Sequence, residues 1–223
     1  MNVRRIPDAT VDRLPVYLRV LLELASQGQG TVSSEQLAEL AGVNAAKVRK
    51  DLSHLGSYGT RGVGYEVEYL RFEITNRLGL GDDSSVAIVG IGNLGRALAS
   101  HPEFRDRGFP VRALFDVDEA KVGSDVDGHV IRHLDDLSPD AGIDIAIGVI
   151  TTPPAVAQEV ADLLVAAGVR AILNFAPTVI SVPDTVTLRK VDLTLELQVL
   201  SFYQQRELAE PAGSAEATVR SAG

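Results

Sequence analysis

The chain has 223 residues, a formal net charge of −9 at pH 7 and no cysteine. Its length suits one large domain or two small ones, and the lack of cysteine excludes disulfides, thiolate metal sites and cysteine redox chemistry. No apolar run approaches the roughly 18 residues of a membrane-spanning helix, and residues 1–8 lack a signal-peptide core, so we expect a cytoplasmic protein with no bound metal and no membrane partner.

The charge is unevenly distributed along the chain. Residues 1–81 contain 10 Lys and Arg against 9 Asp and Glu, for a net charge of +1, whereas residues 82–223 contain 11 against 21, for a net charge of −10. Acidic overall charge argues against loose binding of nucleic acid, but the nearly neutral N-terminal part leaves room for a local basic site.

Periodicity and capping residues predict three helices in the N-terminal part, over residues 12–27, 34–41 and 45–55. Residues 33–36 match a capping box at the start of the second helix, and Asn44 is a favourable N-cap for the third. Only a short turn that contains Gly42 separates these two helices. That spacing is typical of a helix-turn-helix motif.

The third predicted helix has an apolar face and a basic face. Val48, Leu52 and Leu55 share the apolar face, so small and basic residues point the other way. Small residues allow close approach to a groove, and Lys and Arg reach phosphates or guanine edges. A solvated basic face is the plainer alternative, but the helix-turn-helix spacing favours DNA. We expect the DNA-binding residues to be Asn44, Ala46, Lys47, Arg49, Lys50, Ser53, His54, Tyr58 and Arg61.

The glycine-rich segment 57–65 predicts a hairpin-like wing that lays Arg61 along a minor groove or the DNA backbone, with a plain loop as the alternative. A further amphipathic helix is expected over residues 67–78. The polar residues 81–84 then form the best domain boundary.

A phosphate-binding pattern follows this boundary. The apolar run 86–89 is typical of a buried parallel strand, and Gly90, Ile91, Gly92, Asn93, Leu94 and Gly95 give G-x-G-x-x-G ahead of a helical segment, 96–100. The first glycine allows a tight turn, the second lets a pyrophosphate approach the backbone, and the third lets the helix pack on the strand. Alone the pattern is weak, because glycines between a strand and a helix often serve only packing.

A second apolar strand, 111–115, ends at Asp116, which is 21 residues after Gly95. An acidic residue about 20 residues after the glycines accepts hydrogen bonds from the adenosine ribose in dinucleotide-binding folds. The alternative is an ordinary aspartate at a strand end. No arginine follows at once, and Asp118 adds negative charge that would repel a 2′-phosphate. NAD and NADH are therefore the expected cofactors.

The rest of this part alternates strands and helices. We expect a short strand and helix over 129–137, a strand over 143–150, a helix over 155–167 with Thr152 as N-cap and Pro153 at its first position, and a strand over 169–173. Such alternation is typical of a parallel sheet, whose ligands bind at the carboxyl ends of the strands. The residues expected near the nicotinamide are Thr151, Thr152, Asn174, Phe175, Ala176 and Pro177, although each also suits an ordinary loop.

The last predicted helix runs from residue 194 to about residue 207 and has apolar side chains too far around it for one-sided burial, so we expect a partner subunit to cover it. The resulting α/β protein has four parts. A winged helix-turn-helix DNA-binding domain, 1–81, is followed by a Rossmann-like parallel-sheet NAD(H)-binding domain, 82–193. A dimerisation helix, 194–209, and a disordered tail, 210–223, complete the chain.

This combination resembles the Rex family of bacterial redox-sensing transcriptional repressors over residues 6–207. The resemblance rests on the segments 48–53 with Gly56, 62–65, 90–95, 174–177 and 200–202. It implies a homodimer that binds an inverted-repeat operator and releases it when NADH rises relative to NAD. It also implies a C-terminal helix exchanged between subunits, with Phe202 near the partner's nicotinamide. One departure is His101, where the family usually has a tyrosine.

Two other functions are alternatives to this one. An NAD-dependent dehydrogenase needs a proton-transferring group beside the nicotinamide and a substrate-binding domain, and the sequence offers neither, so we expect no catalytic residues. A winged-helix regulator that responds to coenzyme A or another adenine nucleotide is the closer alternative, since related Rossmann domains bind those phosphates too.

Overall fold

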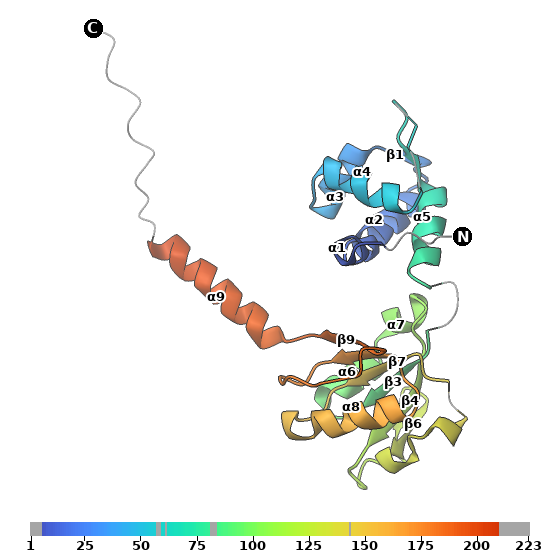
Figure 1. Ribbon diagram of the computed structural model, residues 1–223, viewed down its shortest axis with the longest axis vertical. Coiled ribbons are helices and arrows are strands. Elements are labelled where there is room, and N and C mark those ends of the chain that lie inside the picture. The colour runs from blue at the N-terminus through green and yellow to red at the C-terminus, as the bar shows by residue number, and fades with distance from the viewer. Residues whose placement is uncertain (1–5, 57–58, 61, 81–83, 143, 210–223) are drawn as a thin grey trace. The chain divides into compact units, whose positions relative to one another are not determined.

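The computed structural model describes residues 6–56, 59–60, 62–80, 84–142 and 144–209. The chain divides into two compact units, one of residues 1–84 with 103–110 and one of residues 85–102 with 111–223 (Figure 1). Tyr58, Arg61, most of the expected boundary and the tail 210–223 lie outside the described residues.

The N-terminal unit is a bundle of helices with a small two-stranded sheet. Strand β1 (Thr31–Val32) pairs antiparallel with β2 (Tyr65–Glu66), a pairing that the sequence patterns did not indicate. The helices are α1 (Asp8–Val11), α2 (Leu14–Ser26), α3 (Ser34–Ala41), α4 (Ala45–His54) and α5 (Val67–Arg77). The helix expected over 12–27 is confirmed as α2, and the short helix α1 before it was not predicted.

The predicted helix caps in this unit are confirmed. Ser33 Oγ accepts a hydrogen bond from the N–H of Gln36 at 3.0 Å, and Asn44 Oδ1 accepts one from the N–H of Lys47 at 3.0 Å. Gly42 ends α3 with a φ of +67°, in the left-handed region that glycine favours. These local interactions give the helix-turn-helix its short turn, and a buried core that includes Leu21, Leu37, Val48, Leu52 and Leu70 holds the helices together.

The base of the expected wing is visible in the described residues. Thr60 and Gly64 form an antiparallel bridge. A side chain at Gly64 would overlap the carbonyl oxygen of Val32, so the backbone of β1 packs closely against the backbone at Gly64. The hairpin-like interpretation of this segment is therefore supported over a plain loop.

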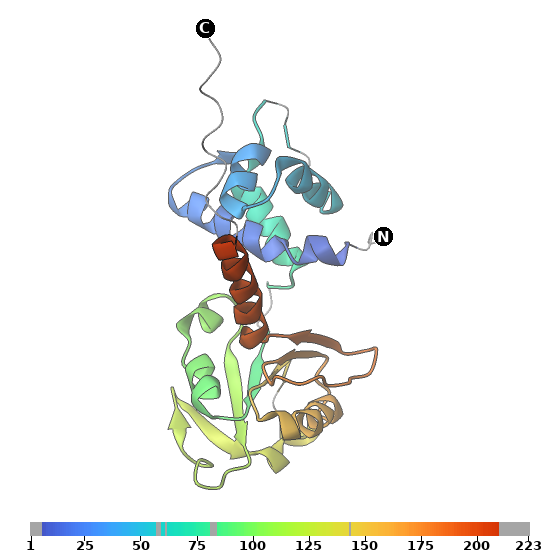
Figure 2. The ribbon, with the colours of Figure 1, turned by 90° about the vertical axis from the view of Figure 1, so that its left-hand side faces the viewer.

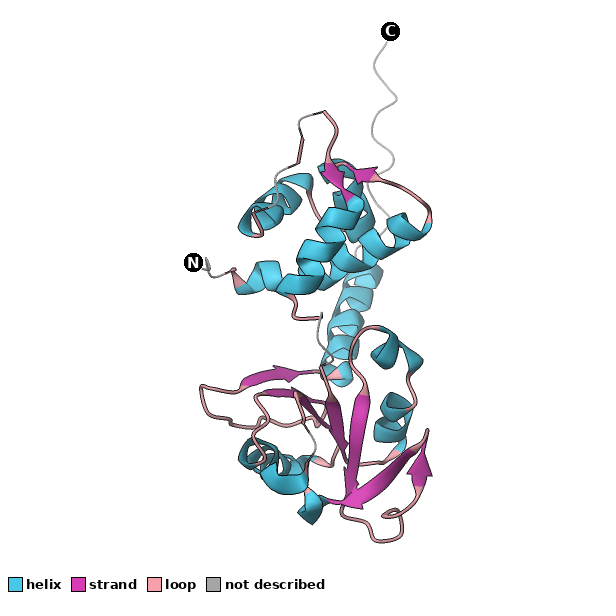
Figure 3. Ribbon diagram, turned by 90° about the vertical axis from the view of Figure 1, so that its right-hand side faces the viewer, coloured by secondary structure: helices cyan, strands magenta, loops and turns pink. Residues whose placement is uncertain are grey.

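The C-terminal unit is built on a sheet whose strands are magenta in Figure 3. The sheet has seven strands in the order β5-β6-β4-β3-β7-β8-β9. All neighbouring strands are parallel except β5 and β6. The strands are β3 (Val86–Val89), β4 (Val111–Asp116), β5 (Asp125–Val126), β6 (His129–His133), β7 (Ile147–Ile150), β8 (Ala171–Asn174) and β9 (Thr187–Lys190). The chain builds outward from β3 in one direction and then returns to its other side at β7. That reversal is the place where open α/β sheets bind ligands.

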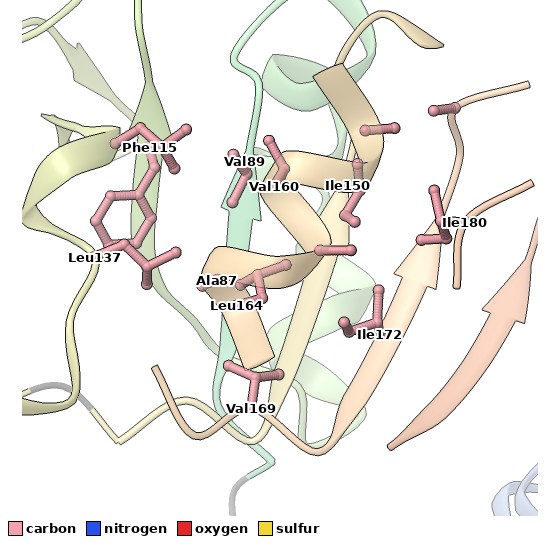
Figure 4. Close-up of a cluster of buried hydrophobic side chains, with 14 of the residues drawn as sticks. Ala87, Val89, Phe115, Leu137, Ile150, Val160, Leu164, Val169, Ile172 and Ile180 are labelled. Carbon is pink, nitrogen blue, oxygen red and sulfur yellow. The ribbon is translucent and has the colours of Figure 1, made fainter. Parts of the chain in front are cut away.

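Helices cover the sheet of this unit. They are α6 (Asn93–Ala99) and α8 (Ala157–Ala166), with short 3₁₀ turns at Leu134–Asp136, Pro139–Ala141 and Pro154–Val156. The short helix α7 (Pro102–Asp106) belongs, apart from its first residue, to the N-terminal unit. Figure 4 shows Val160 and Leu164 of α8 over Ala87, Val89 and Ile150 of the central strands. Every residue of β3 is buried, because both faces of a parallel sheet are covered. This explains why its sequence is a continuous apolar run.

The structure corrects two predicted elements of this unit and adds a strand that was not predicted. The strand expected over 143–150 forms only over Ile147–Ile150. The helix expected over 155–167 begins as a 3₁₀ turn at Pro154 and becomes α-helical at Ala157, and Thr152 does not cap it. Two successive prolines explain the delay, because a residue before proline is pushed out of the helical region. Strand β9 was missed, since it is an edge strand with mostly exposed side chains.

The last helix, α9 (Leu193–Ala209), follows β9 (Figure 2) and carries exposed apolar side chains. Its large apolar residues are between 50% and 65% exposed, and they are Leu193, Leu195, Leu197, Val199, Leu200, Phe202 and Tyr203. The expectation that this helix does not bury its apolar groups within one subunit is confirmed. In the described part of the chain, no helix is long and apolar enough to cross a membrane.

Candidate functional site

The glycine-rich segment after β3 forms a tight cradle. Gly90 has a φ of +96°, and a side chain there would lie 2.7 Å from Cγ2 of Thr152. A side chain at Gly95 would overlap the carbonyl oxygen of Gly90. Gly92 instead faces open space, with no atom within 4 Å of the position of a Cβ. The two flanking glycines close the turn while the middle one leaves room for a ligand, which fits the phosphate-binding interpretation.

A cavity of about 630 Å³ opens beside this cradle, at the carboxyl ends of β3, β4 and β7. Its volume lies in the range of about 300–1,000 Å³ that is usual for ligand pockets. The polar and backbone groups that line it include Gly90, Gly92, Asp116, Lys121, Thr151 and Thr152. The sheet therefore brings the residues that are expected to bind phosphate and ribose to one pocket, from strands that are far apart in the sequence.

Asp116 is held by three donors. Its carboxylate accepts hydrogen bonds from the N–H of Ile91 at 2.7 Å, from the N–H of Asp118 at 2.9 Å and from Lys121 Nζ at 3.0 Å. Burial alone would raise the pKa of Asp116, but these donors outweigh it and hold the pKa below its ordinary value. A carboxylate has about four acceptor positions, so one remains for a donor group of a ligand.

Sequence reasoning missed Lys121. Its ammonium group lies 3.0 Å from Asp116 Oδ2 and 3.6 Å from Asp118 Oδ2, and its side chain is one-third exposed. The charges of Asp116, Asp118 and Lys121 sum to −1, so this end of the pocket is still negative and disfavours a phosphate group. The spacing of five residues from Asp116 could not reveal this pair, because the turn after β4 brings the lysine back.

Two threonines follow β7 at the mouth of the cradle. Thr151 Oγ1 lies 2.7 Å from the carbonyl oxygen of Gly90 and 3.0 Å from that of Val89, so its hydroxyl donates into the glycine turn. Thr152 Oγ1 is buried and has no hydrogen-bond partner among the residues that the structure describes. A buried hydroxyl beside a ligand-sized cavity fits a site whose missing partner is a polar group of the ligand.

The segment after β8 has a supporting arrangement. Asn174 is buried, its Oδ1 accepts from the N–H of Ala176 at 2.8 Å, and its Nδ2 donates to the carbonyl oxygens of Ala176 and Thr178 at 3.2 and 3.3 Å. The N–H of Phe175 donates to the carbonyl oxygen of Ile150 at 2.9 Å. Of this segment, Pro177 lines the cavity. The side chain of Asn174 therefore shapes the loop.

The other predicted cofactor contacts lie outside the cavity wall. Asn93 and Leu94 are exposed in the first turn of α6, and the side chain of Ile91 is buried. Phe202 lies on α9, is 63% exposed and packs edge-to-face with Tyr203 at a centroid distance of 5.6 Å. Among described residues, no cluster of three His, Asp or Glu side chains suits a metal ion.

The exposed face of α4 is the candidate DNA-binding surface. Val48 and Leu52 are fully buried, as predicted. The expected DNA-binding residues that are exposed are Asn44, Ala46, Lys47, Arg49, Lys50 and Ser53. The Asn44 side chain caps the helix, and Ser53 Oγ donates to the carbonyl oxygen of Lys50 at 2.6 Å. His54 is half-buried, and its Nε2 has no hydrogen-bond partner within the described chain.

A buried carboxylate anchors the other side of α4, and sequence reasoning did not find it. Asp51 is 1% exposed. It accepts hydrogen bonds from Thr10 Oγ1 at 2.8 Å, Arg13 Nε and Nη2 at 2.7 and 2.8 Å, and Tyr17 Oη at 2.8 Å. Burial would raise the pKa of Asp51, but the bonds from Arg13, Tyr17 and Thr10 hold it below its ordinary value. This network ties the candidate recognition helix to α1 and α2.

The same network predicts a loss of stability at high pH. Burial, and then the carboxylate of Asp51, raise the pKa of Tyr17 from 10.0 to about 12. The native state keeps this proton more tightly than the unfolded state, so the stabilisation is complete below pH 10 and is lost as the pH rises towards 12. We expect the free energy of unfolding to fall by about 2 kcal/mol over this interval. Urea unfolding of Tyr17→Phe should lack most of that fall, and an equal fall in this variant would contradict the assignment.

Arg49 is engaged in an ion pair on the same helix-turn-helix surface. Its Nη1 donates to Glu35 Oε1 at 2.8 Å and to Ser34 Oγ at 2.9 Å. Ser34 Oγ also lies 3.1 Å from Glu35 Oε2. The Arg49 and Glu35 side chains are 53% and 69% exposed, so both remain accessible to a ligand.

Two family models match the chain. The family model described as "Putative DNA-binding protein N-terminus" matches residues 5–53, and the model described as "CoA binding domain" matches residues 82–178. Relatives named redox-sensing transcriptional repressor Rex are 59% identical over 214 residues in Streptomyces griseus, covering 95% of this chain and 84% of the relative. In Thermus aquaticus the identity is 51% over 198 residues, covering 89% and 93%. The chain belongs to the Rex family.

Solved Rex structures share the fold. The crystal structure of RSP in complex with β-NAD⁺ and operator DNA aligns with a TM-score of 0.86 at 35% identity, over 96% of this chain and 99% of that chain. The complex of RSP with β-NADH aligns with a TM-score of 0.81 at 34% identity, over 92% and 96%. A further RSP structure is described as that of a Rex-family repressor. Membership of the Rex family confirms the predicted fold class. It also confirms the prediction of a transcriptional repressor over that of a dehydrogenase.

Proposed function

We propose that this Rex-family chain is a redox-sensing repressor that acts in the cytoplasm. As a homodimer it binds an inverted-repeat operator, and it releases that DNA when NADH rises relative to NAD. The observation that carries the proposal is that one chain holds both a capped helix-turn-helix and a glycine cradle beside a ligand-sized cavity. The relatives with known ligands bind NAD⁺ with operator DNA, or NADH, and belong to the same family.

The cofactor's pyrophosphate is proposed to lie over residues 90–95, where the backbone N–H groups at the start of α6 face the ligand. One ribose hydroxyl donates to the remaining acceptor position of the Asp116 carboxylate, beside Lys121. Thr152 and the 174–177 loop lie towards the nicotinamide. The unpartnered hydroxyl of Thr152 supports this placement, because a polar ligand group would satisfy it.

The dimer is proposed to form through α9, whose apolar residues are exposed in the single chain. A second copy of the chain offers the same apolar surface. The α9 helix of one subunit can therefore be covered by the α9 helix of the other subunit or by another part of it. In this arrangement the exchanged helix brings Phe202 to the partner's nicotinamide. Rotation of the two subunits on NADH binding would then change the spacing of the recognition helices, which must be about 34 Å for adjacent major grooves.

A regulator that responds to coenzyme A is the second candidate, and the family model for residues 82–178 favours it as a class. Coenzyme A and NAD share an adenosine diphosphate, so both suit the glycine cradle. They differ at the ribose, where coenzyme A carries a 3′-phosphate. The net negative charge of Asp116, Asp118 and Lys121 disfavours that group and supports NAD(H).

The proposal is tested with labelled inverted-repeat DNA selected from a random pool. Fluorescence anisotropy at fixed salt follows the complex as NADH, NAD or coenzyme A is added. Release by NADH at concentrations where NAD has little effect supports the redox repressor. Release by coenzyme A alone supports the second candidate. Tight binding that no nucleotide changes would overturn both.

Lys50→Ala tests the DNA-binding surface. Lys50 is exposed on α4 and is expected to contact a phosphate. The variant should bind all DNA sequences about tenfold more weakly, and the slope of log K against log salt concentration should become shallower by about 1. Affinity for NADH should not change. Glu39→Gln on α3 is the control, and wild-type DNA binding by Lys50→Ala would show that another face reads DNA.

A further inference from the structure

Arg49 forms an ion pair with Glu35, and the proposed DNA contacts assign no role to Glu35. Both hydrogen bonds of Arg49 to α3 come from Nη1, so they leave the edge formed by Nε and Nη2 facing away from Glu35. The other carboxylate oxygen of Glu35 is close to Ser34 Oγ. The pKa of Glu35 is lowered by its own backbone N–H and by Ser34, with Arg49 a smaller cause.

This arrangement matters for the way Arg49 meets DNA. The Nε and Nη2 edge is one of the two edges with which a guanidinium forms a bidentate contact with guanine O6 and N7. Arg49 is the fifth residue of α4, in the N-terminal half of the helix that reads the major groove in helix-turn-helix proteins. A hollow of about 480 Å³ beside the pair, lined in part by Ser34, Gly64 and Tyr65, leaves space at this point.

The charge of Glu35 has a second effect. It neutralises Arg49, so this arginine contributes little to the general attraction for phosphates, which supplies most non-specific binding. An unpaired carboxylate near the DNA backbone would repel it. Non-specific complexes therefore gain little from Arg49, whereas a guanine in the correct place still offers two acceptors to its open edge.

We propose that Glu35 is a specificity-determining residue, which holds Arg49 for guanine recognition and keeps it from binding phosphates indiscriminately. The inference rests on the proposed function, since it requires that α4 reads operator DNA. Glu35 acts through Arg49 and is a positioning residue in this role.

The test compares Glu35→Gln with Glu39→Gln, which removes the same charge from an exposed position one turn further along α3. Exposed ion pairs contribute little to stability, so both variants should fold, and thermal unfolding checks this. Affinities for operator and for scrambled DNA are measured by anisotropy at several salt concentrations. For Glu35→Gln we expect the ratio of the two affinities to fall about tenfold. We also expect the salt slope for scrambled DNA to steepen by about 1.

A double variant separates the two effects of Glu35. In an Arg49→Ala background, Glu35→Gln should no longer lower the affinity ratio or steepen the slope. Equal changes in that background would overturn the inference, because they would arise from Glu35 alone. Identical behaviour of Glu35→Gln and Glu39→Gln would overturn it as well, with the proposed function intact. A wild-type chain with no preference for any selected DNA would overturn the proposed function and this inference together.

Discussion

Replacing Gly95 with alanine is expected to weaken NADH binding by about 100-fold while operator binding survives. A side chain at this position would overlap the carbonyl oxygen of Gly90, which is backbone and has little freedom to move. Either α6 moves away from β3 or the glycine turn opens. Both changes take the N–H groups at the start of α6 away from the phosphates that they are proposed to bind.

The measurement is isothermal titration with NADH, followed by anisotropy of the operator complex with and without NADH. Gly95→Ala should bind operator and fail to release it at NADH concentrations that release the wild-type chain. Ala97→Ser, on an exposed position of the same helix, is the control for a small change in α6. Normal NADH affinity in Gly95→Ala would mean that the cradle is not the phosphate site.

Gly92→Ala separates packing from ligand contact. Nothing lies within 4 Å of a Cβ at this position, and its backbone does not have a positive φ, so the variant should keep wild-type stability. Its methyl group would nevertheless enter the space proposed for the pyrophosphate. Loss of NADH binding in Gly92→Ala without loss of stability would place the ligand directly against the glycine.

Asp51→Asn is expected to destabilise the N-terminal unit by about 3 kcal/mol, the lower end of the range for breaking a buried ion pair. The lower end applies because the Arg13 side chain is 26% exposed and water can solvate part of its charge. The asparagine has the same shape but no charge, and its NH₂ group meets donors from Arg13 and Tyr17. Operator binding should fall with stability, because α4 loses its attachment to α1 and α2.

Urea unfolding of the full chain, followed by circular dichroism, measures this effect, and NADH affinity reports whether the C-terminal unit is intact. Glu23→Gln, an exposed change on α2, is the control. Arg13→Met with Asp51→Asn should cost less than the sum of the two single changes, since both remove one interaction. If the double variant lost as much stability as the two single variants together, the network would not be coupled. Unchanged stability in Asp51→Asn would also contradict a buried network.

Elements with a local signal were predicted well. The caps at Ser33 and Asn44, the buried face of α4 and the glycine turn each depend on residues within one helical turn or one loop. Predictions failed where consecutive prolines change the start of a helix and where a strand forms only by pairing with a distant one. Consecutive prolines delayed the start of α8 and freed Thr152 from the expected cap, and β9 forms only because β8 offers it an edge.

The sequence by itself determined the two kinds of domain and the glycine cradle, because periodicity, capping and positive-φ glycines act over short distances along the chain. Only the tertiary structure showed that Asp51 is a buried anchor 38 residues from Arg13, and that Glu35 holds Arg49 from another helix. It also placed Lys121 against Asp116. The physical reason is that charge pairing depends on distance in space, which folding sets and sequence spacing does not record.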